Sequence, residues 1–189
     1  PPSTNEQRCT RRANMVMSNT DVLLLLQRGY VDIGFMGGAQ IDQFGNLNSS
    51  FIGDADDPKI RLPGTGGGND IASLTNVLVA MLHEKRRFVE NVDFVTSTGF
   101  WHGGSSRADA GLTTGGPAEV ITDLAILGFD EESKRMKVQA LHAGVSAVQV
   151  RENTGFDLLF DTNIKTTEPP TDDELAVLRE FDPDRVYIA

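Results

Sequence analysis

The chain is organised around the stretch Arg61-Leu62-Pro63-Gly64-Thr65-Gly66-Gly67-Gly68-Asn69-Asp70. Four of the five residues from Gly64 to Gly68 are glycines, and a helical pattern follows directly. Glycine loses more backbone entropy on folding than any other residue, so this cluster suits a place where a ligand touches bare backbone. Successive N–H groups in such a loop, followed by a helix, can receive an anion or a developing oxyanion. The alternative is a tight turn that binds nothing.

Two common glycine-rich motifs do not match this loop. A dinucleotide-binding fingerprint needs glycine at the first, third and sixth positions, but with Gly64 as the first position the sixth is Asn69. A P-loop needs Gly-Lys-Ser/Thr, whereas Gly68 is followed by Asn69 and Asp70. The loop is therefore not expected to bind NAD or a nucleoside triphosphate.

Length and charge restrict the class of protein. The 189 residues are enough for one domain with a sizeable core, which we expect to span 1–189. Lys and Arg number 17 against 27 Asp and Glu, and this acidic balance argues against partners such as nucleic acid or a membrane surface. The single cysteine, Cys9, excludes an internal disulfide framework and favours a cytoplasmic setting. No apolar run approaches the roughly 20 residues that span a bilayer.

Short helical and strand patterns alternate on either side of the glycine loop. We expect helices at 18–29, 70–76, 146–153 and 171–180, and strands at 31–36, 49–53, 77–82, 92–97, 119–123, 125–129 and 136–141. Ser18 and Thr171 start capping-box patterns, and Gly29 is placed where the first helix should end. The apolar run 22–26 predicts that this first helix is buried on most sides. This order favours an α/β domain whose site gathers at the carboxyl ends of strands.

Amides and backbone donors follow several of the expected strands. They are Gly37, Gly38, Ala39 and Gln40 after the first strand, then Asn46 and Asn48, and the glycine loop. If these strands are neighbours, their ends meet at one place, where Asn48 could donate to a carboxylate and the loop could present N–H groups to a thioester or phosphate oxygen. Such a site stabilises charge but contains no evident nucleophile.

Other reactive side chains give weaker signals. His83, His102 and His142 are far apart and do not have metal-ligand spacing, so no metal is expected. The acids at 54–57 lack the pattern of a calcium loop and are interpreted as a solvated turn. Cys9 has no neighbouring base, so a catalytic thiol is not expected.

A short charged run, His83-Glu84-Lys85-Arg86-Arg87, follows the expected strand at 77–82. It is either a positively charged binding site for phosphate groups or an exposed charged loop. Positive charge is scarce in this acidic chain, so both interpretations stay open.

Four segments together resemble the β subunits of class I coenzyme A-transferases, most closely the glutaconate CoA-transferase type. They are Phe35-Met36-Gly37-Gly38-Ala39-Gln40-Ile41-Asp42 with Gly45-Asn46-Leu47-Asn48-Ser49; Gly64-Thr65-Gly66-Gly67-Gly68-Asn69-Asp70; His83-Glu84-Lys85-Arg86-Arg87-Phe88 with Asp93-Phe94-Val95-Thr96-Ser97; and Glu152-Asn153-Thr154-Gly155-Phe156-Asp157. The resemblance implies an open, mostly parallel sheet flanked by helices, the α/β fold shared with sugar-phosphate isomerases. It also implies a CoA-transferase α subunit as partner, in an α2β2 hetero-oligomer.

The activity that this resemblance implies is ping-pong transfer of CoA from an acyl-CoA to a carboxylic acid through a glutamyl-CoA thioester. Coenzyme A is then a substrate, and no permanently bound cofactor is expected. By the same resemblance Asn48, Gly67 and Gly68 are the catalytic candidates. The substrate- and CoA-binding candidates are Gly37, Gly38, Ala39, Gln40, Gly64, Gly66 and Asn69.

One feature of the resembling family is missing. Its catalytic glutamate lies in a Glu-Ser-Gly or Glu-Asn-Gly segment upstream of the region that matches Pro1, and no such segment occurs here; Glu6 lies in a different context. We therefore expect a β subunit without its N-terminal part, inactive alone.

Two other functions stay open at this point. One is a CoA-thioester hydrolase of the same fold, including the ring-opening hydrolases of steroid breakdown, which use water in place of the second acid. The other is a non-catalytic subunit in which the glycine loop only shapes an interface. The acyl substrate cannot be inferred from these residues.

Overall fold

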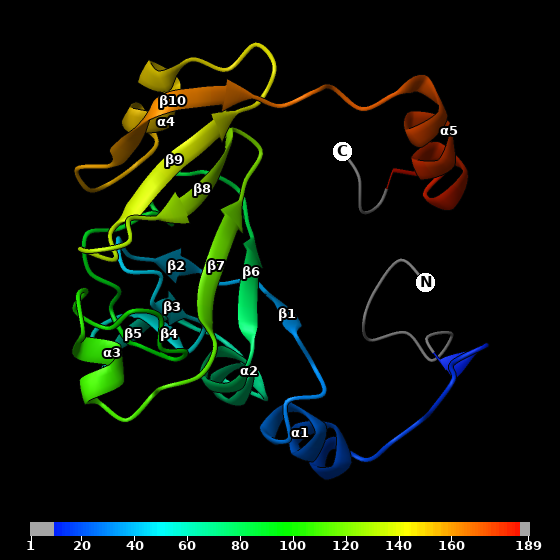
Figure 1. Ribbon diagram of the computed structural model, residues 1–189, viewed down its shortest axis with the longest axis vertical. Helices are drawn as coiled ribbons and strands as arrows, with labels where there is room; N and C mark the ends of the chain where they lie inside the picture. Colours follow the sequence, from blue (N-terminus) through cyan, green and yellow to red (C-terminus); the bar gives the residue numbers. More distant parts are fainter. Residues whose placement is uncertain (1–9, 186–189) are drawn as a thin grey trace.

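A computed structural model describes residues 10–185 and contains a six-stranded sheet in the order β1-β6-β7-β8-β9-β10 (Figure 1). Its strands are β1 (Ile33–Met36), β6 (Asn76–Ala80), β7 (Gly116–Ile121), β8 (Ala125–Phe129), β9 (Met136–Leu141) and β10 (Leu159–Thr166). Three of the five pairings are parallel, and the β7-β8-β9 pairings are antiparallel. The expected α/β class with a mostly parallel sheet is confirmed. The predictions for Cys9 and Glu6 concern residues outside the described range.

Two small antiparallel pairs stand between β1 and the glycine loop along the chain. They are β2 (Gln40–Ile41) with β3 (Leu47–Asn48), and β4 (Phe51–Gly53) with β5 (Pro58–Arg61). The turn between β2 and β3 contains Gly45 at φ +74°, a left-handed conformation that glycine adopts readily. These pairs lie beside the main sheet and bring Asn48 back toward Gln40.

The helices are α1 (Asn19–Gln27), α2 (Gly68–Leu74), α3 (Ser106–Asp109), α4 (Ala147–Glu152) and α5 (Asp172–Phe181). The predicted caps are present, because Ser18 accepts a hydrogen bond from the Asp21 N–H and Thr171 forms a complete capping box with Glu174. Gly29 follows α1 at φ +73°, as a helix stop requires.

The hydrophobic core lies between the central strands and the segments that cover them. Val79, Val120, Leu127 and Val138 come from four adjacent strands and are fully buried. Phe88 packs on the same core, and its ring stacks on that of His83 with 4.0 Å between centroids. Burial of this apolar surface is the main favourable term for the fold.

Two local predictions are wrong. Helix α1 was expected to be buried on most sides, but Leu26 is its one buried side chain, and Val22 and Leu24 are 44% and 39% exposed. The reason is that α1 packs mainly beside α2, which covers only one of its sides. The expected strand at 92–97 forms only an isolated bridge between Leu47 and Ser97, because its polar groups bind the β2–β3 pair instead. The pattern also gave no indication of β5 or β10.

A buried arginine holds the long loop between β6 and β7. The Arg107 guanidinium donates hydrogen bonds of 2.8–2.9 Å to four carbonyl oxygens, those of Thr98, Gly99, Ala72 and Thr114. Arg107 is 5% exposed, and burial lowers the pKa of its guanidinium. Because Ala72 belongs to α2, this side chain fixes the loop to the helix that follows the glycine loop.

Helix α5 stands apart from the sheet at the end of an extended linker (Figure 1). It has no buried residue, and Val177, Leu178 and Phe181 are 56%, 42% and 65% exposed. Among the described residues no helix has the length and apolar character that a membrane span requires.

Candidate functional site

The glycine loop lies directly against the segment that follows Asn48. The Gly64 N–H donates to the Ser49 carbonyl at 2.8 Å, and the Ser49 hydroxyl donates to the Gly64 carbonyl at 2.9 Å. A further bond joins the Leu62 N–H to the Ser50 carbonyl. The expectation that these two segments lie together is confirmed.

The carboxyl end of β1 reaches the same place. The Ala39 N–H donates to the Asn48 carbonyl at 2.8 Å, and a Cβ built on Gly68 would lie 3.1 Å from Cε of Met36, the last residue of β1. Gly38 packs closely here, because a Cβ on it would lie 3.2 Å from the Gln40 carbonyl oxygen and from Leu47 Cδ2, and 3.5 Å from the Asn48 carbonyl oxygen. The structure therefore brings the Gly37–Gln40 turn, Asn48 and the glycine loop together at one edge of the sheet.

Asn48 points inward, and its polar atoms are satisfied within the chain. It is 0% exposed, and its Nδ2 donates to Gln40 Oε1 at 2.8 Å and to the Phe51 carbonyl at 2.7 Å. Its Oδ1 accepts from the Ser50 N–H at 3.0 Å. Both N–H groups of this carboxamide are thus in use, so Asn48 shapes the turn beside the loop rather than offering a free donor.

Gln40 is likewise part of a buried network. Its amide pairs with Asp93 in both directions, since Oε1 accepts from the Asp93 N–H at 3.0 Å and Nε2 donates to Asp93 Oδ2 at 3.2 Å. The same Asp93 carboxylate accepts from the Gly53 N–H at 2.8 Å. Through Asn48 and Gln40 the network joins β2, β3, β4 and the 92–97 segment into one rigid support.

The free donors of the site are backbone groups. Within residues 10–185, neither the Gly66 nor the Gly67 N–H donates a hydrogen bond, whereas the Gly68 and Asn69 N–H groups both bind Thr65. A Cβ at Gly64 or Gly66 would meet no atom within 4 Å, so this part of the loop faces open space. Two adjacent amide donors beside open space form a small site for a negatively charged oxygen.

One polar group under the loop was not anticipated. Ser97 is 1% exposed, its hydroxyl has no partner among the described residues, and a Cβ on Gly68 would lie 3.1 Å from its Oγ. Asn46, by contrast, faces away from this site, since its side chain bonds Asp42, the Gly99 N–H and the Trp101 carbonyl. Burial raises the pKa of the Asp42 carboxyl in this second network. The sequence pattern did not show that Asn48 lies beside the glycine loop while Asn46 belongs to the separate network around Asp42.

The charged run after β6 divides into a buried and an exposed part. His83 is 3% exposed, while Glu84 bonds both Arg86 at 2.9 Å and Arg87 at 2.8 Å. Arg87 also reaches the Gly38 carbonyl at 3.4 Å, at the margin of the site. Both arginines of the run are therefore paired with Glu84, and its carboxyl pKa is lowered chiefly by the Arg87 hydrogen bond.

His83 makes stability depend on pH. Its ring nitrogens lie 3.2 Å from Thr122 Oγ1 and 3.0 Å from Thr154 Oγ1, and burial lowers its pKa from 6.5 to about 4. The unfolded chain therefore takes up this proton at a higher pH than the folded chain. We therefore expect the free energy of unfolding to have its full value above pH 6.5. Below that pH it should fall by about 1 kcal/mol for each pH unit down to pH 4.

Urea unfolding at pH 7.5, 6.5, 5.5 and 4.5, compared with the variant His83→Gln, measures this effect. The comparison removes contributions that both proteins share, such as that of Asp42. Parallel pH profiles for the two proteins would contradict the expectation.

Side chains that could hold a metal do not gather anywhere in residues 10–185. Asp54, Asp56 and Asp57 lie in an exposed turn, where the Asp54 carboxylate accepts from the Asp56 N–H at 2.8 Å.

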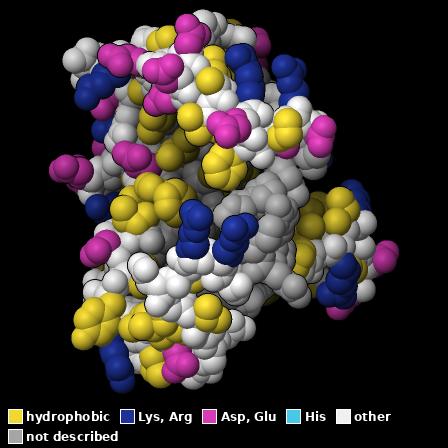
Figure 2. Space-filling view, turned by 90° about the vertical axis from the view of Figure 1, so that its right-hand side faces the viewer, with side chains coloured by type: hydrophobic (Ala, Val, Ile, Leu, Met, Phe, Trp, Pro, Cys, Tyr) yellow, Lys and Arg dark blue, Asp and Glu magenta, His cyan; other side chains and the backbone are white. Residues whose placement is uncertain are grey.

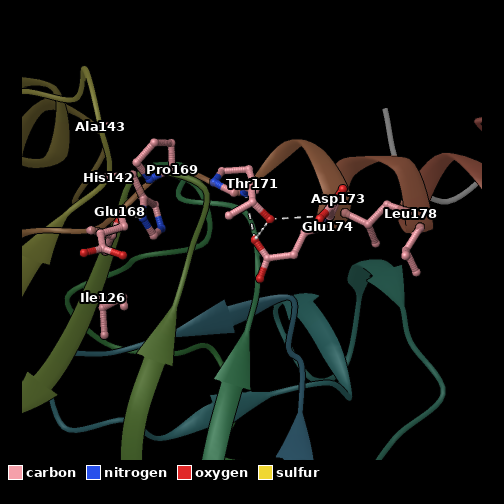
Figure 3. A pocket seen from close by; sticks show the side chains of 12 residues that line it. Ile126, His142, Ala143, Glu168, Pro169, Thr171, Asp173, Glu174 and Leu178 are labelled. Atoms are coloured by element: carbon pink, nitrogen blue, oxygen red, sulfur yellow. Dashed lines mark hydrogen bonds between the residues drawn. The ribbon is translucent and has the colours of Figure 1, made fainter.

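A separate groove of about 1110 Å³ lies between α5 and the sheet (Figure 3). His142 lines it, with Nε2 donating to the Thr122 carbonyl at 2.8 Å and Nδ1 2.8 Å from Thr167 Oγ1. The Thr171–Glu174 capping bonds lie along its wall. None of the predicted site residues lines this groove.

Comparison with known proteins places these observations in a family. The family model described as coenzyme A transferase matches residues 5–153. The β subunit of the 3-oxoadipate CoA-transferase of Pseudomonas knackmussii is 44% identical over 158 residues, covering 83% of this chain and 61% of that protein. The β subunit of the glutaconate CoA-transferase of Acidaminococcus fermentans is 44% identical over 157 residues, covering 82% of this chain and 59% of that protein.

A solved structure agrees with these sequence matches. The crystal structure of glutaconate CoA-transferase from Acidaminococcus fermentans superimposes with a TM-score of 0.87 and 39% identity, over 94% of this chain and 70% of that one. The chain spans about three fifths of the length of the curated relatives that it matches.

Proposed function

Because this chain belongs to the coenzyme A transferase family, we propose that it is the β subunit of an enzyme that moves CoA from an acyl-CoA to a carboxylic acid. A glutamate takes CoA as a glutamyl-CoA thioester and releases the acyl group as a carboxylate; a second carboxylic acid then takes CoA from the glutamate. The partner is a CoA-transferase α subunit in an α2β2 assembly, in the cytoplasm. Coenzyme A enters and leaves as a substrate.

The observation that supports this proposal is the pair of N–H groups at Gly66 and Gly67, which bind no acceptor among the described residues. A thioester carbonyl gains negative charge on oxygen when a carboxylate attacks it, and two fixed amide donors stabilise that oxygen without reorganising. Gly64 anchors the loop to Ser49, and the buried Gly68 backs it, packed between Met36 and Ser97.

The remaining predicted residues have supporting roles in this proposal. Asn48 positions the loop through the turn that it holds with Phe51, and Gln40 braces that turn against Asp93. Ala39 ties the end of β1 to Asn48 through its N–H, Gly38 packs beside the Gln40 and Asn48 carbonyl oxygens, and Gly37 lets the chain pass close to the Ala80 carbonyl on β6. Asn69 stands at the start of α2 with its N–H bound to Thr65, which leaves its exposed side chain available to CoA.

An exchange assay tests the proposal. The assembled enzyme is incubated with acyl-CoA and isotopically labelled acetate or glutarate, while free thiol is followed in the same sample. We expect label to enter the CoA-ester pool without accumulation of free CoA. Release of free CoA without exchange would show a hydrolase instead, and acyl-CoA binding without either reaction would show a non-catalytic subunit.

A further inference from the structure

Unpaired polar side chains are rare inside this molecule, although charged and apolar side chains mix on the surface shown in Figure 2. Two buried side-chain atoms lack a hydrogen-bond partner within residues 10–185, Ser97 Oγ and Arg107 Nε. The two terminal nitrogens of Arg107 still hold four carbonyl groups, whereas the hydroxyl is the whole polar part of the Ser97 side chain. A buried hydroxyl without a partner is costly, so Ser97 indicates a ligand that completes its hydrogen bonding.

Ser97 lines a narrow cavity between α2, β6 and the turn that joins β2 to β3. We name it the Ser97 cavity; Gly45, Ala72, Thr98 and Gly99 belong to its wall. Its volume is about 10 Å³. One water molecule needs roughly 10–15 Å³ of such space, so the cavity has room for a single water and for no organic ligand.

Most backbone groups in the wall of the Ser97 cavity are already bonded. Arg107 donates to the carbonyl oxygens of Ala72, Thr98 and Gly99. The residues that β6 and β7 contribute pair with each other in the sheet. A complete account of the buried backbone groups therefore leaves few that could bind a further molecule.

Two backbone groups of the wall are unpaired among the described residues. The buried Gly45 carbonyl accepts no hydrogen bond, and the Thr98 N–H donates none. The Gly45 carbonyl faces Gly99, since a Cβ on Gly99 would overlap its oxygen. Buried backbone groups are almost always paired, either with protein groups or with ordered water. Together with the Ser97 hydroxyl, these two groups surround one small cavity with unused hydrogen-bonding capacity.

We propose that the Ser97 cavity binds one water molecule that joins Ser97, Gly45 and Thr98. The water accepts hydrogen bonds from the Thr98 N–H and the Ser97 hydroxyl, and it donates one to the Gly45 carbonyl. Three hydrogen bonds are the usual number for a buried water. The water thereby links the 97–98 segment to the turn between β2 and β3.

This water site lies beneath the start of α2, next to the glycine loop. A Cβ on Gly68 would lie 3.1 Å from Ser97 Oγ, and Gly68 directly follows Gly67, whose N–H we assign to the thioester oxygen. With the water bound, the Ser97 hydroxyl has one fixed orientation against Gly68. Ser97 is therefore a positioning residue for the Gly67 amide. This positioning role rests on the proposed function, whereas the water site does not.

A high-resolution crystal structure of the protein tests the water site directly. We expect electron density for one water at about 2.7–3.2 Å from Ser97 Oγ, the Gly45 oxygen and the Thr98 nitrogen. The same density should be missing in Ser97→Val, because a methyl group takes its place. An empty cavity in the original protein would overturn the proposal, as would a Ser97 hydroxyl bonded to a protein group.

Thermal unfolding distinguishes a hydrated cavity from a dry one by the sign of the change. If the cavity holds water, Ser97→Val leaves the Gly45 carbonyl and the Thr98 N–H unpaired, and the unfolding temperature should fall by about 5–10 °C. Ser97→Ala leaves room for the water and should change it by at most about 3 °C. In a dry cavity the valine would fill space and remove an unpaired hydroxyl, so a higher unfolding temperature for Ser97→Val would contradict the proposal.

Steady-state kinetics of the assembled enzyme test the positioning role. Ser97→Val should lower kcat about tenfold and leave KM for acyl-CoA within about twofold, because the loop amides act in the transition state. The matched control is Ser73→Ala, since the Ser73 hydroxyl lies on the same helix but donates to the Asn69 carbonyl at 2.7 Å. Both of its constants should stay within about twofold.

An unchanged kcat for Ser97→Val would overturn the positioning role. Failure of the proposed function would be seen separately, as a lack of exchange by the original enzyme. Diffraction and thermal unfolding locate the water whether or not the enzyme transfers CoA.

Discussion

Gly67→Pro is expected to lower kcat/KM of the assembled enzyme by about 10²- to 10³-fold, mostly through kcat. Proline removes the backbone N–H that we assign to the thioester oxygen. Gly67 has φ −88°, close enough to the proline value for the ring to fit with a small adjustment. Gly66 before it has no Cβ to meet the ring, and with φ +51° only its backbone N–H has to make room for the proline Cδ. A loss of rate with an unchanged unfolding temperature reports on the donor rather than on the fold of the loop.

Gly67→Ala is the matched control for this substitution. It keeps the N–H, and its Cβ would lie 3.6 Å from Leu23 Cδ2, an ordinary contact distance. We expect its kcat/KM to stay within about threefold of the original enzyme. Steady-state kinetics with thermal unfolding curves for both variants measure the difference. Equal rates for the proline and alanine variants would show that the Gly67 N–H does not take part.

Arg107→Met is expected to lower the free energy of unfolding by about 3–5 kcal/mol. The substitution keeps an apolar stem but leaves four carbonyl groups without their donor, the buried ones of Gly99 and Ala72 and the partly buried ones of Thr98 and Thr114. Arg107→Lys should recover only part of the loss, because one ammonium group cannot reach both pairs of carbonyls that the two guanidinium arms reach. Urea unfolding at pH 7.5 gives these values.

Arg86→Met is the control for a surface arginine. Arg86 is 75% exposed and pairs only with Glu84 among the described residues, so its loss should change the free energy of unfolding by at most about 0.5 kcal/mol. A loss of less than 1 kcal/mol for Arg107→Met would show that water replaces the guanidinium at these carbonyls.

Local signals in the sequence predicted the parts of the fold that local chemistry controls. The caps at Ser18 and Thr171 are recognisable because a hydroxyl and a following polar residue satisfy exposed N–H groups within three residues. The strands β6, β8 and β9 are recognisable because their apolar runs are bounded by charged or turn residues. The glycine loop was also identified from local sequence, because four glycines within five residues are rarely found outside a turn or a backbone binding site.

The remaining features depend on contacts between distant segments. Residues 92–97 have the composition of a strand, but Asp93 and Thr96 bind Gln40 and Leu47, more than 45 residues earlier. Asn48 was expected to offer a donor, yet Phe51 and Gln40 take both of its N–H groups. The exposure of Val22 and Leu24 on α1 could not be predicted, because an apolar run does not show which faces of a helix pack against other elements.

The connectivity of the sheet also sets an order of assembly. Strands β7, β8 and β9 follow one another with short turns, so their ladders form from neighbouring residues. Pairing of β1 with β6, and of β6 with β7, closes loops of about 40 residues each. Such closures are entropically slower, so the β7–β9 ladders are expected to form on the folding route before the Gly66 and Gly67 amides reach their final positions. Strand β1 then stays unpaired while the β7–β9 ladders form, and the yield of folded chain in cells should depend on synthesis temperature and chaperone supply.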